Sequence, residues 1–305
     1  MSSLSIGSLA SAAQASGDGP PIAALRPALP ASLYGYEVVG HIGEGAGSQI
    51  YCVTQPGTGQ LYALKHVVRR QDKDIRFIEQ LEAEHEVGRQ VAHPNLRRVI
   101  DFKQTRRLFK VVEAALVMEL FDGVSLESEL PRNYAPLLRV FIHTAEALRA
   151  MHAAGYLHCD LKPSNILYNP RLEVKVIDLG QACRTGTAKQ RIQGTPDYIS
   201  PEQVKCKALG PQTDVYNLGA TMYWCLAGRK MPTLFTAGKG ENAILSDDLI
   251  PSPARLNPQI PEGLSNFIME CVRLNPAKRP ANMDEVIQRL NLFEHFMAQR
   301  EAGAS

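Results

Sequence analysis

Three polar side chains occur at fixed offsets in two short segments of this chain, and strand-like apolar runs flank both segments. Asp160 and Asn165 lie in the first segment, and Asp178 ends the second. The flanking runs are rich in β-branched, aliphatic and aromatic residues and occupy residues 156–157, 166–168 and 174–177. Short strands of this kind hold the loops between them rigidly. We therefore predict a globular fold in which short strands position two polar loops.

The side-chain types in these loops suit the transfer of a phosphoryl group. Asp160 can accept the proton of an attacking hydroxyl, and Lys162 can neutralise charge on the moving group. Asn165 and Asp178 offer hard oxygen ligands for Mg²⁺ that bridges the phosphates of ATP. An isolated Asp or Asn in a loop is more often a solvated surface residue, but the flanking strands favour a site here. The pattern predicts a nucleotide-dependent transfer reaction.

Six short motifs along the chain resemble those of a eukaryotic-type (Hanks-type) Ser/Thr protein kinase, in the style of the bacterial members. The family has a glycine loop, a strand lysine, a helix glutamate, a catalytic loop, a metal-binding aspartate and a Pro-Glu anchor, in that order. The matching positions here are residues 42–50, Lys65, Glu84, residues 158–165, Asp178 and residues 201–202. The resemblance runs from about residue 36 to about residue 296.

The resemblance implies an α+β fold with two lobes, in which the N-lobe is an antiparallel sheet with one helix and the C-lobe is mainly helical. The hydrophobic pattern favours strands at residues 36–42, 49–54 and 60–68 and a helix at residues 72–91. After Pro131, helical apolar stretches occur at residues 136–154, 212–227, 263–274 and 283–293. We expect one kinase domain at residues 34–298, a flexible tail at residues 1–33 and a short C-terminal tail at residues 299–305.

The resemblance places ATP between the lobes. The glycine loop would cover the phosphates, Lys65 would grip the α- and β-phosphates, and Ala63 would lie against the adenine. Met118 would border the back of the adenine pocket, and the backbone of residues 119–121 would hydrogen-bond the adenine edge. The implied ATP-binding residues are Ile42, Gly43, Glu44, Gly45, Ala46, Gly47, Ser48, Ile50, Ala63, Lys65, Glu84, Met118, Glu119, Leu120, Phe121 and Leu167.

The acidic helix after Lys65 offers more than one partner for this lysine. Glu84 is favoured because it shares a helix face with Val87 and Val91, as an inward-pointing residue should. Glu82 and Glu86 are the weaker alternatives.

Further motifs favour a protein as the phosphoryl acceptor. Small-molecule kinases generally lack the anchors that Glu202, Arg279 and Asp214 resemble. The resemblance implies a buried ion pair between Glu202 and Arg279 and a role for Asp214 in holding the catalytic loop. Lys162 and Thr195 are typical of enzymes that act on Ser and Thr. Thr185 and Thr187 lie in the activation segment and are candidate autophosphorylation sites.

The chain departs from the family pattern at several positions, three of which bear on the site and its regulation. Ser48 stands where the third glycine of the loop is expected. Cys159 replaces an arginine that often pairs with a phosphate on the activation segment, so we expect regulation without that contact. We interpret Cys159 as a buried inert cysteine, with a redox role as the alternative. Gly88 lies where an apolar side chain normally packs, which predicts a packing defect near Glu84.

Composition bounds the possible partners. The chain has 33 Lys and Arg against 31 Asp and Glu, a net charge of +2, so no global charge points to nucleic acid or a membrane surface. Six cysteines without a CxxC pair suit a reducing compartment. No apolar run approaches the ~18 residues that span a bilayer. We expect a cytoplasmic protein that acts on protein substrates, and nothing in the sequence specifies an oligomeric state.

Two alternatives to an active kinase stay open at this level. A nucleotide-responsive scaffold would explain the departures at Gly88 and Cys159, although every charged catalytic residue is retained. A small-molecule kinase would phosphorylate a metabolite and no protein. The favoured prediction is a Ser/Thr protein kinase that uses ATP and Mg²⁺.

Overall fold

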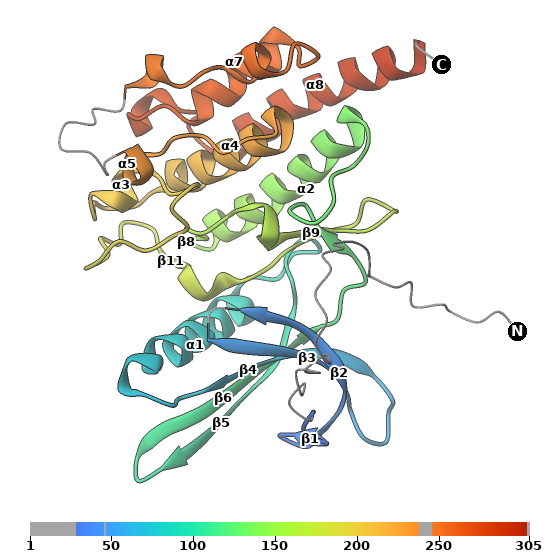
Figure 1. Cartoon of the computed structure of the whole chain (residues 1–305), viewed down its shortest axis with the longest axis vertical. Helices are drawn as coiled ribbons and strands as arrows, with labels where there is room; N and C mark the ends of the chain where they lie inside the picture. Colours follow the sequence, from blue (N-terminus) through green and yellow to red (C-terminus); the bar gives the residue numbers. More distant parts are fainter. Residues whose placement is uncertain (1–28, 46, 238–245, 304–305) are drawn as a thin grey trace, which may run out of the picture.

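A sheet lobe and a helical lobe make up the chain, as a computed structural model describes it for residues 29–45, 47–237 and 246–303 (Figure 1). The sheet of the N-lobe has six antiparallel strands in the order β1-β2-β3-β4-β6-β5. Its strands are β1 (Ser32–Leu33), β2 (Tyr36–Gly45), β3 (Ser48–Thr54), β4 (Leu61–Val68), β5 (Val99–Arg107) and β6 (Lys110–Glu119). The predicted α+β fold with two lobes is confirmed.

One helix covers a face of this sheet. The short 3-10 helix η1 (Asp72–Asp74) leads into α1 (Ile75–Gln90). Ile78 and Leu81 lie three residues apart on α1 and pack on strand β6, where alternate residues from Ala114 to Met118 point toward the helix. Glu84 lies at the next three-residue step, so the hydrophobic stripe of α1 carries a buried carboxylate toward the other lobe.

The second lobe contains the larger hydrophobic core and is built mainly from helices (Figure 1). Its helices are α2 (Tyr134–Ala153), α3 (Pro201–Val204), α4 (Pro211–Ala227), α5 (Leu234–Ala237), α6 (Pro253–Leu256), α7 (Glu262–Cys271) and α8 (Met283–Gly303). Helix α4 begins with Pro211 and ends at Gly228, whose φ of 69° suits a glycine and whose N–H donates to the carbonyl of Trp224.

Short strands at the lobe boundary carry the polar loops. One small sheet has the order β10-β9-β7 and consists of β7 (Val124–Ser125), β9 (Ile166–Tyr168) and β10 (Val174–Val176). A second pairs β8 (Tyr156–Leu157) with β11 (Cys183–Arg184). The 3-10 helices η2 (Pro163–Asn165) and η3 (Leu179–Gln181) contain or follow the polar residues. The strands predicted around the two loops therefore position them.

The two predicted domain limits differ from the observed elements. Strand β1 begins within the segment predicted as a tail, because Ser32 and Leu33 pair with Glu37 and Tyr36 of β2. Helix α8 continues to Gly303, beyond the predicted limit at residue 298. The rest of the predicted N-terminal tail, residues 1–28, and Ala46 of the glycine loop lie outside the described residues.

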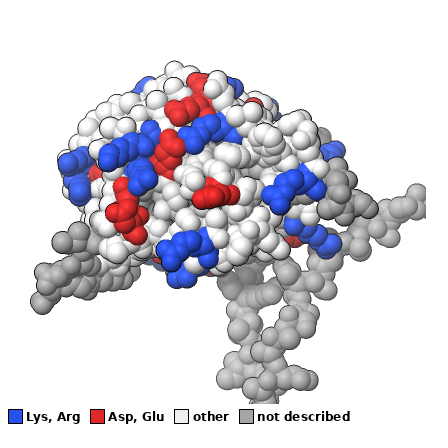
Figure 2. Space-filling view, turned by 90° about the horizontal axis from the view of Figure 1, so that it is seen from above, with Lys and Arg blue, Asp and Glu red and all other residues white. Residues whose placement is uncertain are grey.

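The surface of the helical lobe carries charges of both signs. Figure 2 shows positive and negative side chains interspersed on the face opposite the sheet. Charged side chains of this lobe also form ion pairs between helices, such as Arg149 on α2 with Asp284 on α8 at 3.1 Å. Among the described helices, none is long and apolar enough to cross a membrane.

Candidate active site

The two lobes enclose a cleft of about 610 Å³ that gathers most of the polar residues singled out in the sequence. Its lining includes Glu44, Gly45, Ile50, Lys65, Glu84, Met118, Asp160, Lys162, Asn165 and Asp178. Residues as distant in the sequence as Glu44 and Asp178, 134 positions apart, therefore meet in one cavity.

Lys65 lies between two carboxylates at the back of the cleft. Its Nζ donates to Glu84 Oε2 at 2.8 Å and to Asp178 Oδ1 at 2.9 Å. Burial alone would lower the pKa of Lys65, but the two carboxylates outweigh it and raise the pKa above its ordinary value. The structure places Glu84 beside Lys65, whereas Glu86 lies 3.4 Å from the hydroxyl of Tyr156. Lys65 is thus held charged and pointed into the cleft.

Asp160 and Lys162 of the first polar loop form a compact triangle with Thr195. The Thr195 hydroxyl donates to Asp160 Oδ1 at 2.8 Å, and Lys162 Nζ donates to Thr195 Oγ1 at 3.0 Å. Lys162 Nζ also lies 3.4 Å from Asp160 Oδ2. Asn165 Nδ2 donates to the backbone carbonyl of Asp160 at 2.9 Å, which fixes the loop internally. The carboxylate of Asp160 and the ammonium of Lys162, which line the cleft, therefore meet at the Thr195 hydroxyl.

Asn165 and Asp178 present oxygen atoms to the same cavity. Asp178 has a left-handed backbone with φ of 64°, an uncommon conformation for a residue other than glycine. Burial would raise the pKa of Asp178, but Lys65 and other nearby cations hold it below its ordinary value, so this residue is a carboxylate at neutral pH. The amide of Asn165 donates through nitrogen, which leaves its oxygen as an acceptor.

This donor set fits a hard divalent cation bound together with a phosphate. In the described part of the chain, no cluster of three or more His, Cys, Asp or Glu could hold a metal by itself. Mg²⁺ is commonly held by one or two protein oxygens, with water and substrate phosphates as the other ligands. Asp178 and Asn165 supply that number of protein ligands.

The adenine side of the predicted site is only partly in the cleft. Ala63 pairs with Met118 across β4 and β6, and both side chains are buried. The side chain of Glu119 pairs with Lys175 at 2.9 Å and its N–H donates to the carbonyl of Arg98 at 2.9 Å, so neither group is left for a nucleotide. Several predicted residues do not line the cleft, namely Ile42, Gly43, Gly47, Ser48, Ala63, Glu119, Leu120, Phe121 and Leu167.

The tip of the glycine loop contacts helix α1 through a residue that the sequence analysis missed. Gly47 has φ of 75°, and a Cβ on it would lie 2.4 Å from the ring of Phe77. Glycine is therefore required here by backbone conformation and by space. Gly47, Ser48 and Phe77 line a neighbouring hollow of about 430 Å³. Phe77 lies in the first turns of α1, where an aromatic residue resembles any other core position in sequence.

Arg97 is a second cleft residue that sequence reasoning missed. It follows Leu96 at the entry to β5, and its backbone N–H donates to Val176 O at 3.0 Å. Its Nε atom is buried and has no hydrogen-bond partner among the described residues. Burial lowers the pKa of Arg97, against the opposing effect of Glu84 and other carboxylates. With Lys65 it balances the charges of Glu84 and Asp178 in the cleft.

Asp214 on α4 holds the backbone before Asp160. Its carboxylate accepts the N–H groups of His158 at 2.9 Å and Cys159 at 2.8 Å, and the ring of His152 at 2.8 Å. Burial would raise the pKa of Asp214, but its bond to His152 and the backbone bonds keep it below its ordinary value. The catalytic loop is thus anchored to the core of the helical lobe by a buried charge.

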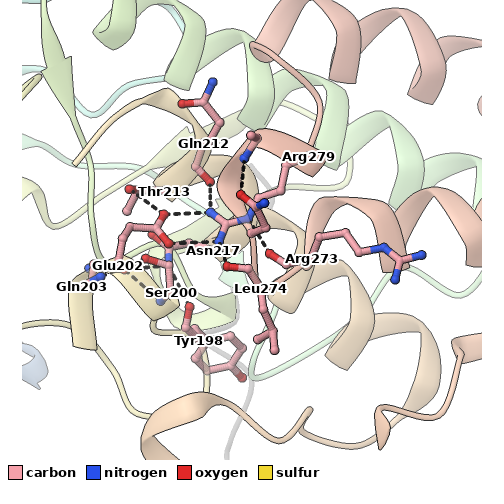
Figure 3. A network of polar contacts seen from close by, with 12 residues as sticks. Tyr198, Ser200, Glu202, Gln203, Gln212, Thr213, Asn217, Arg273, Leu274 and Arg279 are labelled. Atoms are coloured by element: carbon pink, nitrogen blue, oxygen red, sulfur yellow. Dashed lines mark hydrogen bonds and ion pairs between the residues drawn. The ribbon is translucent and has the colours of Figure 1, made fainter. Parts of the chain in front are cut away.

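A second buried charge network anchors the segment after Thr195 (Figure 3). Arg279 donates to Glu202 Oε1 at 2.7 Å and to Oε2 at 2.9 Å. It also donates to the carbonyls of Gln212 and Arg273, both at 2.7 Å. The carboxylate of Glu202 accepts a further bond from Thr213 at 3.0 Å. The ion pair expected between Glu202 and Arg279 is therefore present in the structure.

Gly88 is not a packing defect. A Cβ at this position would lie 2.3 Å from Cγ2 of Val99, because the β5 side chain occupies the space beside the helix. The spacing of residues along α1 carries no information on the neighbouring strand that fills this space. The expectation of a packing defect is wrong, because the side chain of Val99 fills the space that a side chain at position 88 would occupy.

Comparisons with known proteins agree with this architecture. A family model described as "Protein kinase domain" matches residues 36–290. The chain is 31% identical over 264 residues to serine/threonine-protein kinase PknA of Mycobacterium tuberculosis, a match that covers 84% of this chain and 60% of PknA. It is 30% identical over 267 residues to serine/threonine-protein kinase pkn3 of Myxococcus xanthus, covering 82% of this chain and 48% of pkn3. The chain therefore spans less than two thirds of either relative.

Proposed function

The chain belongs to the protein kinase family, and from this membership we propose that it transfers the γ-phosphoryl group of ATP to Ser or Thr hydroxyls of proteins. The observation that carries the proposal is the triangle of Asp160, Lys162 and Thr195 in the cleft. This arrangement sets a proton acceptor beside a cation, and both residues line the cleft. The relatives' names give the same specificity for those proteins.

Each polar residue has one role in this proposal. Asp160 orients the acceptor hydroxyl and accepts its proton, while Lys162 stabilises the charge on the group in transfer. Lys65 holds the nucleotide phosphates, and Glu84 positions Lys65 through the 2.8 Å ion pair. Asn165 and Asp178 hold the divalent metal, which we propose to be Mg²⁺. A bound metal neutralises charge on the phosphates.

Other residues of the chain support proposals for the class of substrate, the site of autophosphorylation and the cellular environment. We propose protein substrates, since the Glu202 and Arg279 anchor supports a segment on which an extended peptide can dock. Thr185 is the better candidate for autophosphorylation because it is exposed, whereas Thr187 is half-buried. Six free cysteines support a reducing, cytoplasmic environment.

The first experiment is the intact mass of the protein after incubation with ATP and Mg²⁺, followed by incubation with a Ser/Thr peptide library. The wild type should gain phosphate and phosphorylate peptides, and Asp178→Ala should do neither. Asp284→Ala is the matched control, because this exposed aspartate pairs with Arg149 on the far side of the lobe. Equal phosphate on wild type and Asp178→Ala would refute the proposal. Labelling of small hydroxylated metabolites alone would replace it with the small-molecule kinase.

A further inference from the structure

Two cysteines from two functional segments face one another below the cleft. Cys159 directly precedes Asp160 in the catalytic loop, and Cys183 lies on β11, at the start of the activation segment. Their Sγ atoms are 3.6 Å apart. The pairing of β8 with β11 produces this contact, since Cys183 lies opposite Leu157 in the register. Leu157 and Leu209 complete a small apolar cluster around the two thiols.

The backbone of Cys159 is held from both sides. Its N–H donates to Asp214 Oδ1 at 2.8 Å, and its carbonyl accepts from Gln203 Nε2 at 2.7 Å. Its φ of 64° is left-handed, which is uncommon for a residue with a side chain. The thiol of Cys159 is therefore fixed toward β11 and is fully buried, whereas Cys183 is half-buried. An oxidant can reach Cys183 first.

The environment separates the reactivity of the two thiols. The hydrogen bond from Cys159, with help from Lys189, lowers the pKa of Cys183 to about 7, although burial acts in the opposite direction. The same hydrogen bond and burial raise the pKa of Cys159. Lys189 is itself held near this site by its bond to the carbonyl of Gln181 at 2.6 Å. Cys183 is therefore the more accessible thiol of the pair and the one that ionises more readily.

We propose that Cys159 and Cys183 form a reversible disulfide that joins the catalytic loop to the activation segment, with a hydroperoxide as the oxidant. The thiolate of Cys183 attacks one peroxide oxygen, the O–O bond breaks, and a sulfenic acid forms as hydroxide leaves. The sulfur of Cys159 then displaces the hydroxyl group from Cys183 as water. In sum, two thiols and one hydrogen peroxide give one disulfide and two water molecules. A dithiol reductant reverses the reaction by exchange.

The cross-link favours the arrangement that the structure shows. Formation of an S–S bond of about 2.05 Å requires the two sulfurs to approach by roughly 1.5 Å from their present separation. Conformations in which the segments have moved apart cannot form it. The arrangement that can form it also contains the Lys65 to Glu84 ion pair and the bond of Thr195 to Asp160. A bond made in one conformation shifts the population toward that conformation.

The disulfide would take the place of a contact that is common in the family and that this chain is expected to lack. Cys159 stands where many relatives carry an arginine that pairs with a phosphate on the activation segment. A disulfide between the same two segments would hold them without any phosphate. This functional consequence rests on the proposed kinase activity, whereas formation of the disulfide does not.

The test compares reduced protein with protein treated with one equivalent of hydrogen peroxide after the reductant is removed. We expect the intact mass to fall by two hydrogen atoms and the titratable thiols of the denatured protein to fall from six to four. A peptide map without reduction should contain one species that links Cys159 to Cys183. Cys183→Ser should abolish this species. Cys206→Ser is the matched control, a half-buried cysteine elsewhere that should leave it intact.

Activity and proteolysis then test the consequence. Oxidised wild type should resist cleavage within residues 184–195 and phosphorylate peptide faster than the reduced form, and dithiothreitol should reverse both differences. No cross-link, or a cross-link between other cysteines, would overturn the proposal. Slower phosphorylation by the cross-linked form would overturn the stabilising effect. A cross-linked protein that is inactive in both states would instead refute the proposed function and leave the disulfide standing.

Discussion

Replacing Arg279 with methionine removes the cation that neutralises a buried carboxylate. The Arg279 side chain is 0% exposed and Glu202 is 7% exposed, so water cannot replace the lost bonds. Glu202 would keep the bond from Thr213 but lose both bonds from Arg279, and the carbonyls of Gln212 and Arg273 would each lose a donor. Stranding one charge of a buried pair costs ~3–5 kcal/mol.

We therefore expect Arg279→Met to lower the free energy of unfolding by about 4 kcal/mol. At roughly 2–4 °C per kcal/mol for a domain of this size, the melting temperature should fall by about 8–16 °C. Urea unfolding followed by the fluorescence of Trp224, the one tryptophan of the chain, measures the loss. Trp224 lies on α4 and so reports on the lobe that holds the pair.

Two further variants separate the effect of the stranded Glu202 charge from a general loss of stability. Arg149→Met breaks the exposed pair with Asp284, which should be worth ~1 kcal/mol or less. Glu202→Met combined with Arg279→Met removes both charges and should recover part of the loss, because no uncompensated ion remains. A loss for Arg279→Met no greater than that for Arg149→Met would refute the reasoning, as would a double variant less stable than either single one.

Three other outcomes follow from the structure. Burial would raise the pKa of Glu202, but Arg279 holds it below the ordinary 4.5 in the folded protein, so the stability that depends on this charge is fully present above about pH 4.5 and is lost as pH falls through the folded pKa. The stability difference between wild type and Arg279→Met should therefore be largest near neutral pH and shrink in acid, where the stranded carboxylate of the variant is protonated. Gly88→Leu should destabilise the protein by about 1–3 kcal/mol in a melting experiment, since its Cβ meets Val99. Thr195→Val should lower kcat for peptide phosphorylation about 10-fold or more by releasing Asp160.

Each of these outcomes has a matched control. A pH dependence shared equally by wild type and Arg279→Met would exclude Glu202 as its source. Val99→Ala should partly rescue Gly88→Leu by vacating the contested space, and no rescue would contradict the packing argument. Thr195→Ser keeps the hydroxyl and should keep most of the activity. Equal losses in the Ser and Val variants would show that the hydroxyl is unimportant.

The chain's local patterns predicted helices and the strands that carry the polar loops, and the family resemblance predicted their arrangement in two lobes. The alternating residues of β4 and β6 and the three-residue steps of α1 are local signals, readable within a few residues. The same local signal selected Glu84 over Glu82 and Glu86. The pairing of Glu202 with Arg279, 77 residues apart, was expected from family resemblance and not from any local rule.

The contacts that local patterns did not predict involve side chains from distant elements. Phe77 meets Gly47 across the glycine loop, and Val99 of β5 fills the space at Gly88 of α1. Arg97 enters the cleft from a strand start that resembles any surface basic position. Such contacts depend on how strands and helices pack together, which spacing along one element does not specify.

The sequence by itself determined which chemical groups the site contains, because Asp160, Asn165 and Asp178 lie in short loops whose internal offsets are set by the chain. Their roles stay predictions for the phosphoryl-transfer experiment. Only the tertiary structure decided that Cys183 lies 3.6 Å from Cys159. The two residues are 24 positions apart, and their meeting results from the pairing of two two-residue strands, β8 and β11. So short a pairing carries little sequence signal, because its register is set by the surrounding core.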